Sequence, residues 1–153
     1  MKKPVRLLAL CLAACVLAEC PAGGSASETE PFIDLDLSGM SGTVVYAQVY
    51  NLMYEYQSWL GKTIRIAGYY NYYDDQAHGI VYHACVVPDA TACCAQGIEF
   101  VLAGEHAWPE EYPAIGTDIV VTGQLELYED EGVPYLHLVN AEMVFEETPE
   151  ELH

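Results

Sequence analysis

The chain has 153 residues, of which 23 are acidic and five are basic, so its formal net charge at pH 7 is −18. Three of the basic residues, Lys2, Lys3 and Arg6, precede the first apolar run; a chain without them keeps two basic residues against 23 acidic ones, a net charge of −21. Because affinity for DNA and RNA depends on Lys and Arg that neutralise phosphates, this composition argues against a nucleic-acid partner. A cationic, small-molecule or protein partner remains compatible with it.

The amino-terminal segment predicts secretion and a lipid anchor. Basic residues precede a short apolar run, Leu7–Ala14, and small residues at 13 and 14 come directly before Cys15. This pattern is typical of a secretory signal and resembles the bacterial lipoprotein signal, in which cleavage precedes a cysteine that is then lipidated. We therefore predict a signal peptide over residues 1–14, lipidation of Cys15 and an extracytoplasmic, membrane-anchored location. Cys20 is the alternative processed cysteine, although Glu19 beside it fits a cleavage site poorly.

The next segment predicts a tether followed by one helix. From Pro21 to Asp36 the composition turns to Gly, Ser, Glu and Pro, which favours a flexible acidic tether over residues 15–37 before a domain at 38–145. Ser41 is suited to cap a helix whose apolar residues recur at three- and four-residue steps until Gly61: Val45, Val49, Leu52, Met53, Tyr56 and Leu60. A second stripe, Tyr46, Tyr50 and Tyr54, is interpreted as the edge of the buried face.

Beyond Lys62 the apolar residues alternate, which predicts strands. We expect five: Lys62–Tyr73 with a bend or a bulge at Gly68, Ile80–Val87, Ile98–Leu102, Ile119–Leu127 and Tyr135–Phe145. The long connection Ala103–Gly116 falls between the third and fourth strands, and residues 146–153 form an acidic tail. The predicted fold class is mainly β (α+β), with one amino-terminal amphipathic helix followed by a five-stranded OB-like barrel.

The stretch Tyr82–Phe100 carries the strongest candidate chemistry. Cys85, Cys93 and Cys94 favour a disulfide from Cys85 to either of the other two, worth about 2–3 kcal/mol by chain entropy. A thiol-redox role or a zinc site are the alternatives, since His83 and Cys85 share one side of a strand and complete a Cys₃His set. The secondary candidate ligands are Asp89, Glu99 and His106.

Motifs for catalysis are not apparent in the sequence. It holds no nucleophile elbow, phosphate-binding loop or dinucleotide fingerprint, and a cysteine nucleophile would depend on His83 or His106 as its base. We therefore expect a non-enzymatic binding or accessory module, with metal binding or thiol redox chemistry as the alternative.

Four sequence features stand out together: Ser41-Gly-Thr-Val-Val-Tyr46, Gly61-Lys62, Tyr112-Pro113 with Gly116 and, most specifically, Asp89-Ala-Thr-Ala-Cys-Cys-Ala-Gln-Gly-Ile-Glu-Phe100. In these residues the chain resembles a group of uncharacterised bacterial lipoproteins with an OB-like domain, similar to a family named for its anticodon-binding domains. The resemblance implies an OB-like fold at the cell surface and no established activity.

Overall fold

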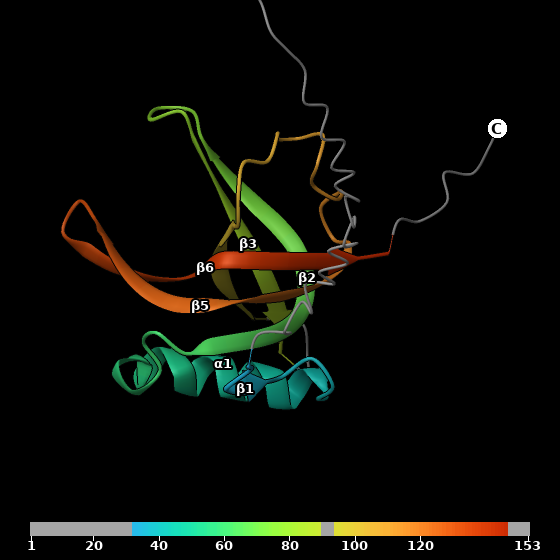
Figure 1. Ribbon diagram of the computed structural model, residues 1–153, viewed down its shortest axis with the longest axis vertical. Helices are drawn as coiled ribbons and strands as arrows, with labels where there is room; N and C mark the ends of the chain where they lie inside the picture. Colours follow the sequence, from blue (N-terminus) through green and yellow to red (C-terminus); the bar gives the residue numbers. More distant parts are fainter. Residues whose placement is uncertain (1–31, 90–93, 147–153) are drawn as a thin grey trace, which may run out of the picture. The chain divides into compact units, whose positions relative to one another are not determined.

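The computed structural model describes residues 32–89 and 94–146, which form a mainly β fold with one α-helix (Figure 1). A two-residue strand, β1 (Leu35–Asp36), precedes helix α1 (Gly42–Tyr54) and a short 3-10 turn, Tyr56–Ser58. The remaining strands are β2 (Thr63–Asp75), β3 (Ile80–Pro88), β4 (Ala95–Leu102), β5 (Asp118–Asp130) and β6 (Val133–Phe145). The predicted signal peptide, Cys15, Cys20, Cys93 and residues 147–153 lie outside the described residues. Within the described ranges, no helix is long and apolar enough to cross a membrane.

The strands form one sheet in the order β1-β2-β3-β4-β6-β5, with a further pairing between β2 and β5. The first half of β2, Thr63–Tyr69, pairs with β5, and its second half, Tyr69–Asp75, pairs with β3. The pairings therefore run from β2 through β3, β4, β6 and β5 and return to β2. The β4–β6 pair is parallel, whereas the other pairs in this cycle are antiparallel.

Gly68 lies where β2 changes partner, in agreement with the bend expected there. A Cβ atom at this position would lie 2.5 Å from the carbonyl oxygen of Val86 and 2.8 Å from the sulfur of Cys85. Only a residue without a side chain allows β2 and β3 to approach this closely.

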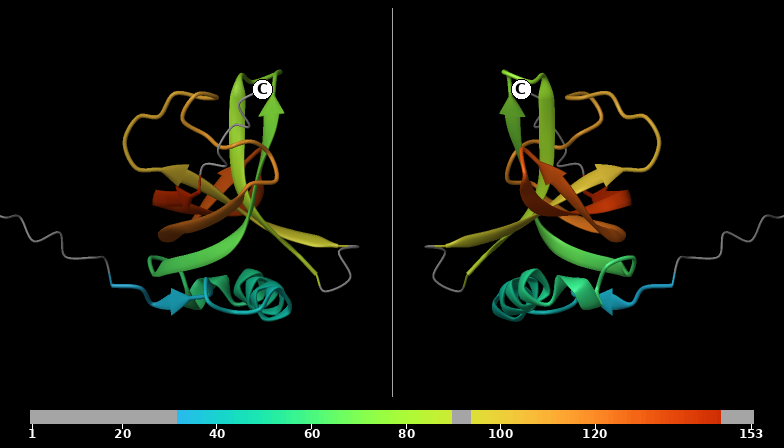
Figure 2. Two further views of the ribbon diagram at one scale, coloured as in Figure 1. Left: turned by 90° about the vertical axis from the view of Figure 1, so that its right-hand side faces the viewer. Right: turned by 90° about the vertical axis from the view of Figure 1, so that its left-hand side faces the viewer.

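The core is formed by the inward residues of all five long strands together with one face of α1. Val45, Val49 and Leu52 on the helix are buried, as the three- and four-residue spacing predicts. Figure 2 shows α1 lying along one side of the strands, and its contacts are with β2, β3 and β4. The remaining buried apolar residues are Leu37, Ile64, Ile66, Tyr70, Cys85, Val87, Ile98, Phe100, Ile119, Val121, Leu125, Leu138 and Ala141.

The domain begins earlier in the chain than the predicted boundary at residue 38. The predicted tether extends to residue 37, yet Leu35 and Asp36 form β1 beside β2, and Leu37 is fully buried. The amide of Leu37 donates to the carbonyl of Arg65, so the chain is held by the sheet before the helix begins. The few apolar residues of this polar stretch are sufficient to form a strand, because the edge of the sheet supplies hydrogen-bond partners for its backbone.

The helix and its tyrosine stripe also differ from the expectation. The α-helix ends at Tyr54 rather than continuing to Gly61, because Trp59 packs against the core and Gly61 bonds to Leu125 at the entry to β2. Tyr46 is half-buried, but Tyr50 and Tyr54 are exposed and contact each other at 5.5 Å. Residues four positions apart differ by about 40° in their direction from the helix axis, so the stripe of Tyr46, Tyr50 and Tyr54 turns away from the buried face.

Candidate functional site

Cys85, the central candidate of the cysteine-rich stretch, is a buried free thiol on β3. Its side chain is 0% exposed and lies against Gly68. Burial raises the pKa of the Cys85 thiol to about 12, so the group stays protonated at neutral pH. Since thiolates rather than thiols bind metals and attack substrates, Cys85 in this state is a core residue.

The hairpin register separates Cys85 from Cys94. Cys85 pairs with Ile98, whereas the exposed Cys94 accepts a backbone hydrogen bond from Asp89 at 2.9 Å, one step beyond the pair of Pro88 and Ala95. Four residues of strand correspond to about 13 Å, and a disulfide needs Cα atoms within about 7 Å. A bond between Cys85 and Cys94 would therefore require a different register, and a bond to Cys93 stays a prediction.

The predicted zinc ligands are brought together only in part. His83 and Cys85 do share the inward side of β3, and His83 lines one cavity together with Glu99 and His106, but Cys85 is not part of that lining and Asp89 lies at the hairpin end. Among residues 32–89 and 94–146, no group of three His, Cys, Asp or Glu side chains is placed to hold a metal ion.

A cavity of about 450 Å³ lies where β3 and β4 cease to pair, next to the connection after β4 and the β5–β6 hairpin. The last pair of the β3–β4 ladder is His83 with Phe100, and both residues line the cavity. Its other titratable lining residues are Tyr82, Glu99, His106, Tyr112, Tyr128 and His137. This volume lies within the range of small-molecule sites in proteins.

The inner wall is a stack of aromatic rings around His83. The His83 imidazole lies parallel to the Tyr112 ring, with centroids 4.0 Å apart, and its Nδ1 is 2.8 Å from the Tyr70 hydroxyl. Burial lowers the pKa of His83 and raises the pKa of Tyr70 to about 12. Since the Tyr70 hydroxyl is protonated and the imidazole is neutral, the two groups share one hydrogen bond, in which either the hydroxyl or Nδ1–H is the donor.

A second part of the lining carries the carboxylate of Glu99. The Tyr128 hydroxyl donates to Oε2 of Glu99, and the Tyr128 ring lies 5.5 Å from Tyr135 and 4.6 Å from His137 between ring centroids. Burial is the largest cause that raises the pKa of Tyr128, and the hydrogen bond to Glu99 is the second. The hydrogen bond therefore fixes the orientation of Glu99, and the Tyr128 phenol stays protonated.

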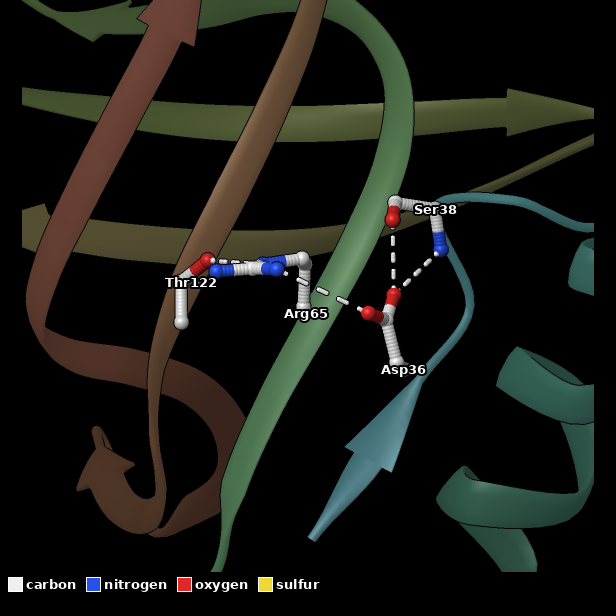
Figure 3. Close-up of polar contacts among 4 residues, drawn as sticks. All are labelled: Asp36, Ser38, Arg65 and Thr122. Carbon is white, nitrogen blue, oxygen red and sulfur yellow. Dashed lines mark hydrogen bonds and ion pairs between the residues drawn. The ribbon is translucent and has the colours of Figure 1, made fainter. Parts of the chain in front are cut away.

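The two basic residues of the described chain are engaged away from this cavity. Arg65 donates to the Thr122 hydroxyl at 3.0 Å and pairs with Asp36 at 3.6 Å, as Figure 3 shows; Ser38 donates to the same carboxylate. The Lys62 ammonium lies 4.7 Å from the centroid of the Trp59 ring. Neither lines the cavity.

Sequence reasoning missed Tyr82, Tyr112, Tyr128 and His137 as cavity residues. They come from β3, the connection, β5 and β6, so no spacing in the chain links them. Glu99 and His106 were singled out, but as metal ligands. The sequence signal available was only the high number of tyrosines, 12 in the chain.

The neutral state of His83 makes a prediction about pH. Because its folded pKa lies below the unfolded value of about 6.5, protonation favours the unfolded chain as pH falls below that value. We expect His83→Phe to lose less stability than wild type between pH 7.5 and pH 5, measured by urea unfolding. His78→Gln is the control of opposite sign: the bond to Asp75 raises the His78 pKa, so His78 stabilises at low pH. Equal pH dependence of wild type and His83→Phe would contradict the assignment.

Comparison of the chain with protein-family models, curated proteins and solved structures finds no match.

Proposed function

We propose that this chain is a lipid-anchored, non-enzymatic OB-like binding module on the extracytoplasmic face of a membrane, with the cavity beside β3 and β4 as its binding site. The strand pairing supports a five-stranded barrel, since it returns to β2 and includes one parallel pair, β4 with β6. The motif resemblance supports assignment to the OB-like lipoprotein group.

The cavity beside β3 and β4 carries the proposal. The second and third strands of an OB barrel form its usual binding face, flanked by the loop between the first two strands and the loop between the last two. Here the equivalent strands are β3 and β4, and Tyr128 of β5 and His137 of β6 complete the wall. Binding is favoured over catalysis because the buried Cys85 thiol, with a pKa of about 12, is unsuited to act as a nucleophile.

A screen of small compounds by two-dimensional NMR tests this function. We expect a ligand to shift resonances of cavity residues, and Val101→Trp, which places a large ring at the lining, to abolish the shifts. Val101 and Val44 are both exposed, but Val44 lies on α1, so Val44→Trp is the matched control and should leave binding unchanged. Ligand shifts that persist in Val101→Trp would refute this site, and the absence of any ligand would refute the function.

A zinc or thiol-redox role at the Cys85–Cys94 loop is the second candidate, favoured by the shared orientation of His83 and Cys85 on β3. Calorimetric titration of the reduced protein with zinc tests it. One-to-one binding that weakens at least about tenfold in His83→Ala would favour it over the cavity model.

The proposed anchor makes a prediction of its own. Cys15→Ala should release the protein from membranes or leave it unprocessed, because the atom that receives the lipid is gone. Membrane fractionation and mass spectrometry measure this, with Cys20→Ala as the matched control. If Cys20→Ala has this effect and Cys15→Ala does not, the processing site is Cys20.

A further inference from the structure

Glu99 gives the cavity a fixed negative charge. Its carboxylate accepts the Tyr128 hydrogen bond, and on β4 it lies between Ala84 of β3 and His137 of β6. Within the described part of the chain the ion pairs join other residues, and Arg65 and Lys62 are engaged elsewhere. A carboxylate at a partly enclosed wall that holds no Lys or Arg side chain attracts a positively charged ligand.

Tyrosine rings of the lining suit such a ligand, and Tyr82 and Tyr128 are the two that interact with Glu99. Tyr82, Tyr112 and Tyr128 line the cavity, and the face of a tyrosine ring attracts a cation within about 6 Å of its centroid. Burial raises the pKa of all three phenols, so they remain uncharged at neutral pH. The neutral His83 adds no opposing positive charge.

The charges near the cavity have the same sign. Burial is the largest cause that raises the pKa of Tyr82, and the negative charges of Asp130, Asp75 and Glu99 are the next largest. Asp75 lies at the β2–β3 turn and Asp130 at the β5–β6 turn, and Figure 1 shows both hairpins extending toward the left of the view. Asp130 also raises the pKa of His78 on the first of these turns, which places the two turns within electrostatic reach. Anionic ligands are disfavoured here.

We propose that the ligand of this cavity is a small organic ammonium ion, held between the Glu99 carboxylate and the rings of Tyr82 and Tyr128. This inference rests on the proposed binding function and narrows it to one chemical class. Quaternary ammonium groups fit best, because aromatic rings provide attraction without the hydrogen-bond acceptors that a primary ammonium also needs.

NMR titration of the full chain with choline, and with its uncharged isostere in which a tert-butyl group replaces trimethylammonium, tests the class. We expect saturable one-to-one shifts at the cavity residues with choline, and binding at least about tenfold weaker for the isostere. Glu99→Gln removes the charge but keeps an acceptor for Tyr128, and it should weaken choline binding at least about tenfold. Glu55→Gln, an exposed carboxylate at the end of α1, is the matched control and should change it less than about twofold.

Each other outcome overturns the proposal in a recognisable way. Equal affinity for choline and its isostere, or full choline binding by Glu99→Gln, would refute the ammonium class while leaving a binding cavity. The ammonium class would also be refuted if choline did not bind while neutral or anionic compounds of the screen shifted the resonances of the cavity residues. If no compound binds at the cavity, the binding function fails together with its ligand class.

Discussion

Gly68→Ala is expected to destabilise the fold by about 2–3 kcal/mol, which lowers the melting temperature by roughly 10 °C in a domain of this size. The added methyl would lie 2.5 Å from the carbonyl oxygen of Val86, a backbone atom that cannot rotate away, and 2.8 Å from the Cys85 sulfur. Strands β2 and β3 would have to separate at the point where β2 leaves β5. Thermal and urea unfolding measure the effect.

Gly97→Ala on β4 is the matched control. A Cβ atom there would meet nothing closer than the Cγ2 atom of Val86 at 3.5 Å, an ordinary contact. Both substitutions reduce the freedom of the unfolded chain equally, so their difference isolates the steric clash. If both variants melt at the wild-type temperature, the close approach of β2 and β3 is wrong.

The regular part of the fold could be predicted because burial repeats along the chain. Alternation from Thr63 onward identified all five long strands, and the spacing of Val45, Val49 and Leu52 identified the helix and its buried face. The prediction failed where an element forms for a reason other than a periodic pattern of apolar residues. The parallel bridge of Leu35 to Ile64 joins residues from two segments, and only the sheet edge makes a strand of Leu35–Asp36.

The candidate site was less predictable than the fold. Local reasoning directed attention to the cysteines, since they are close in sequence, but the register of β3 and β4 places Cys85 in the core and Cys94 near Asp89. The cavity depends on the ends of four separate segments, where Tyr112 meets His83 and Tyr128 meets Glu99. Such contacts follow from topology, which alternation alone does not fix.

Cys85→Ser is the second substitution with a large expected effect. A hydroxyl at this fully buried site has Gly68 as its close neighbour and would lose its hydrogen bonds to water, for a loss of about 1–3 kcal/mol. Cys85→Ala removes the sulfur without adding a polar group, so it should cost less, about 1 kcal/mol. Thermal unfolding of both variants measures the difference, which reports the polarity of the site.

Reducing agent separates this core role from the predicted disulfide. With Cys85 as a buried thiol, reductant should leave the wild-type melting temperature unchanged, and native protein should resist alkylation at Cys85 until it unfolds. A pKa of about 12 against about 8.5 for an ordinary cysteine lowers the thiolate fraction roughly a thousandfold, in addition to the steric protection. If reductant lowers the melting temperature of wild type but not of Cys85→Ser, and peptide mapping finds Cys85 joined to Cys93 or Cys94, then Cys85 forms a stabilising disulfide. A bond from Cys85 to Cys94 would require β3 and β4 to pair differently near Pro88, because the register described here keeps Cys85 opposite Ile98.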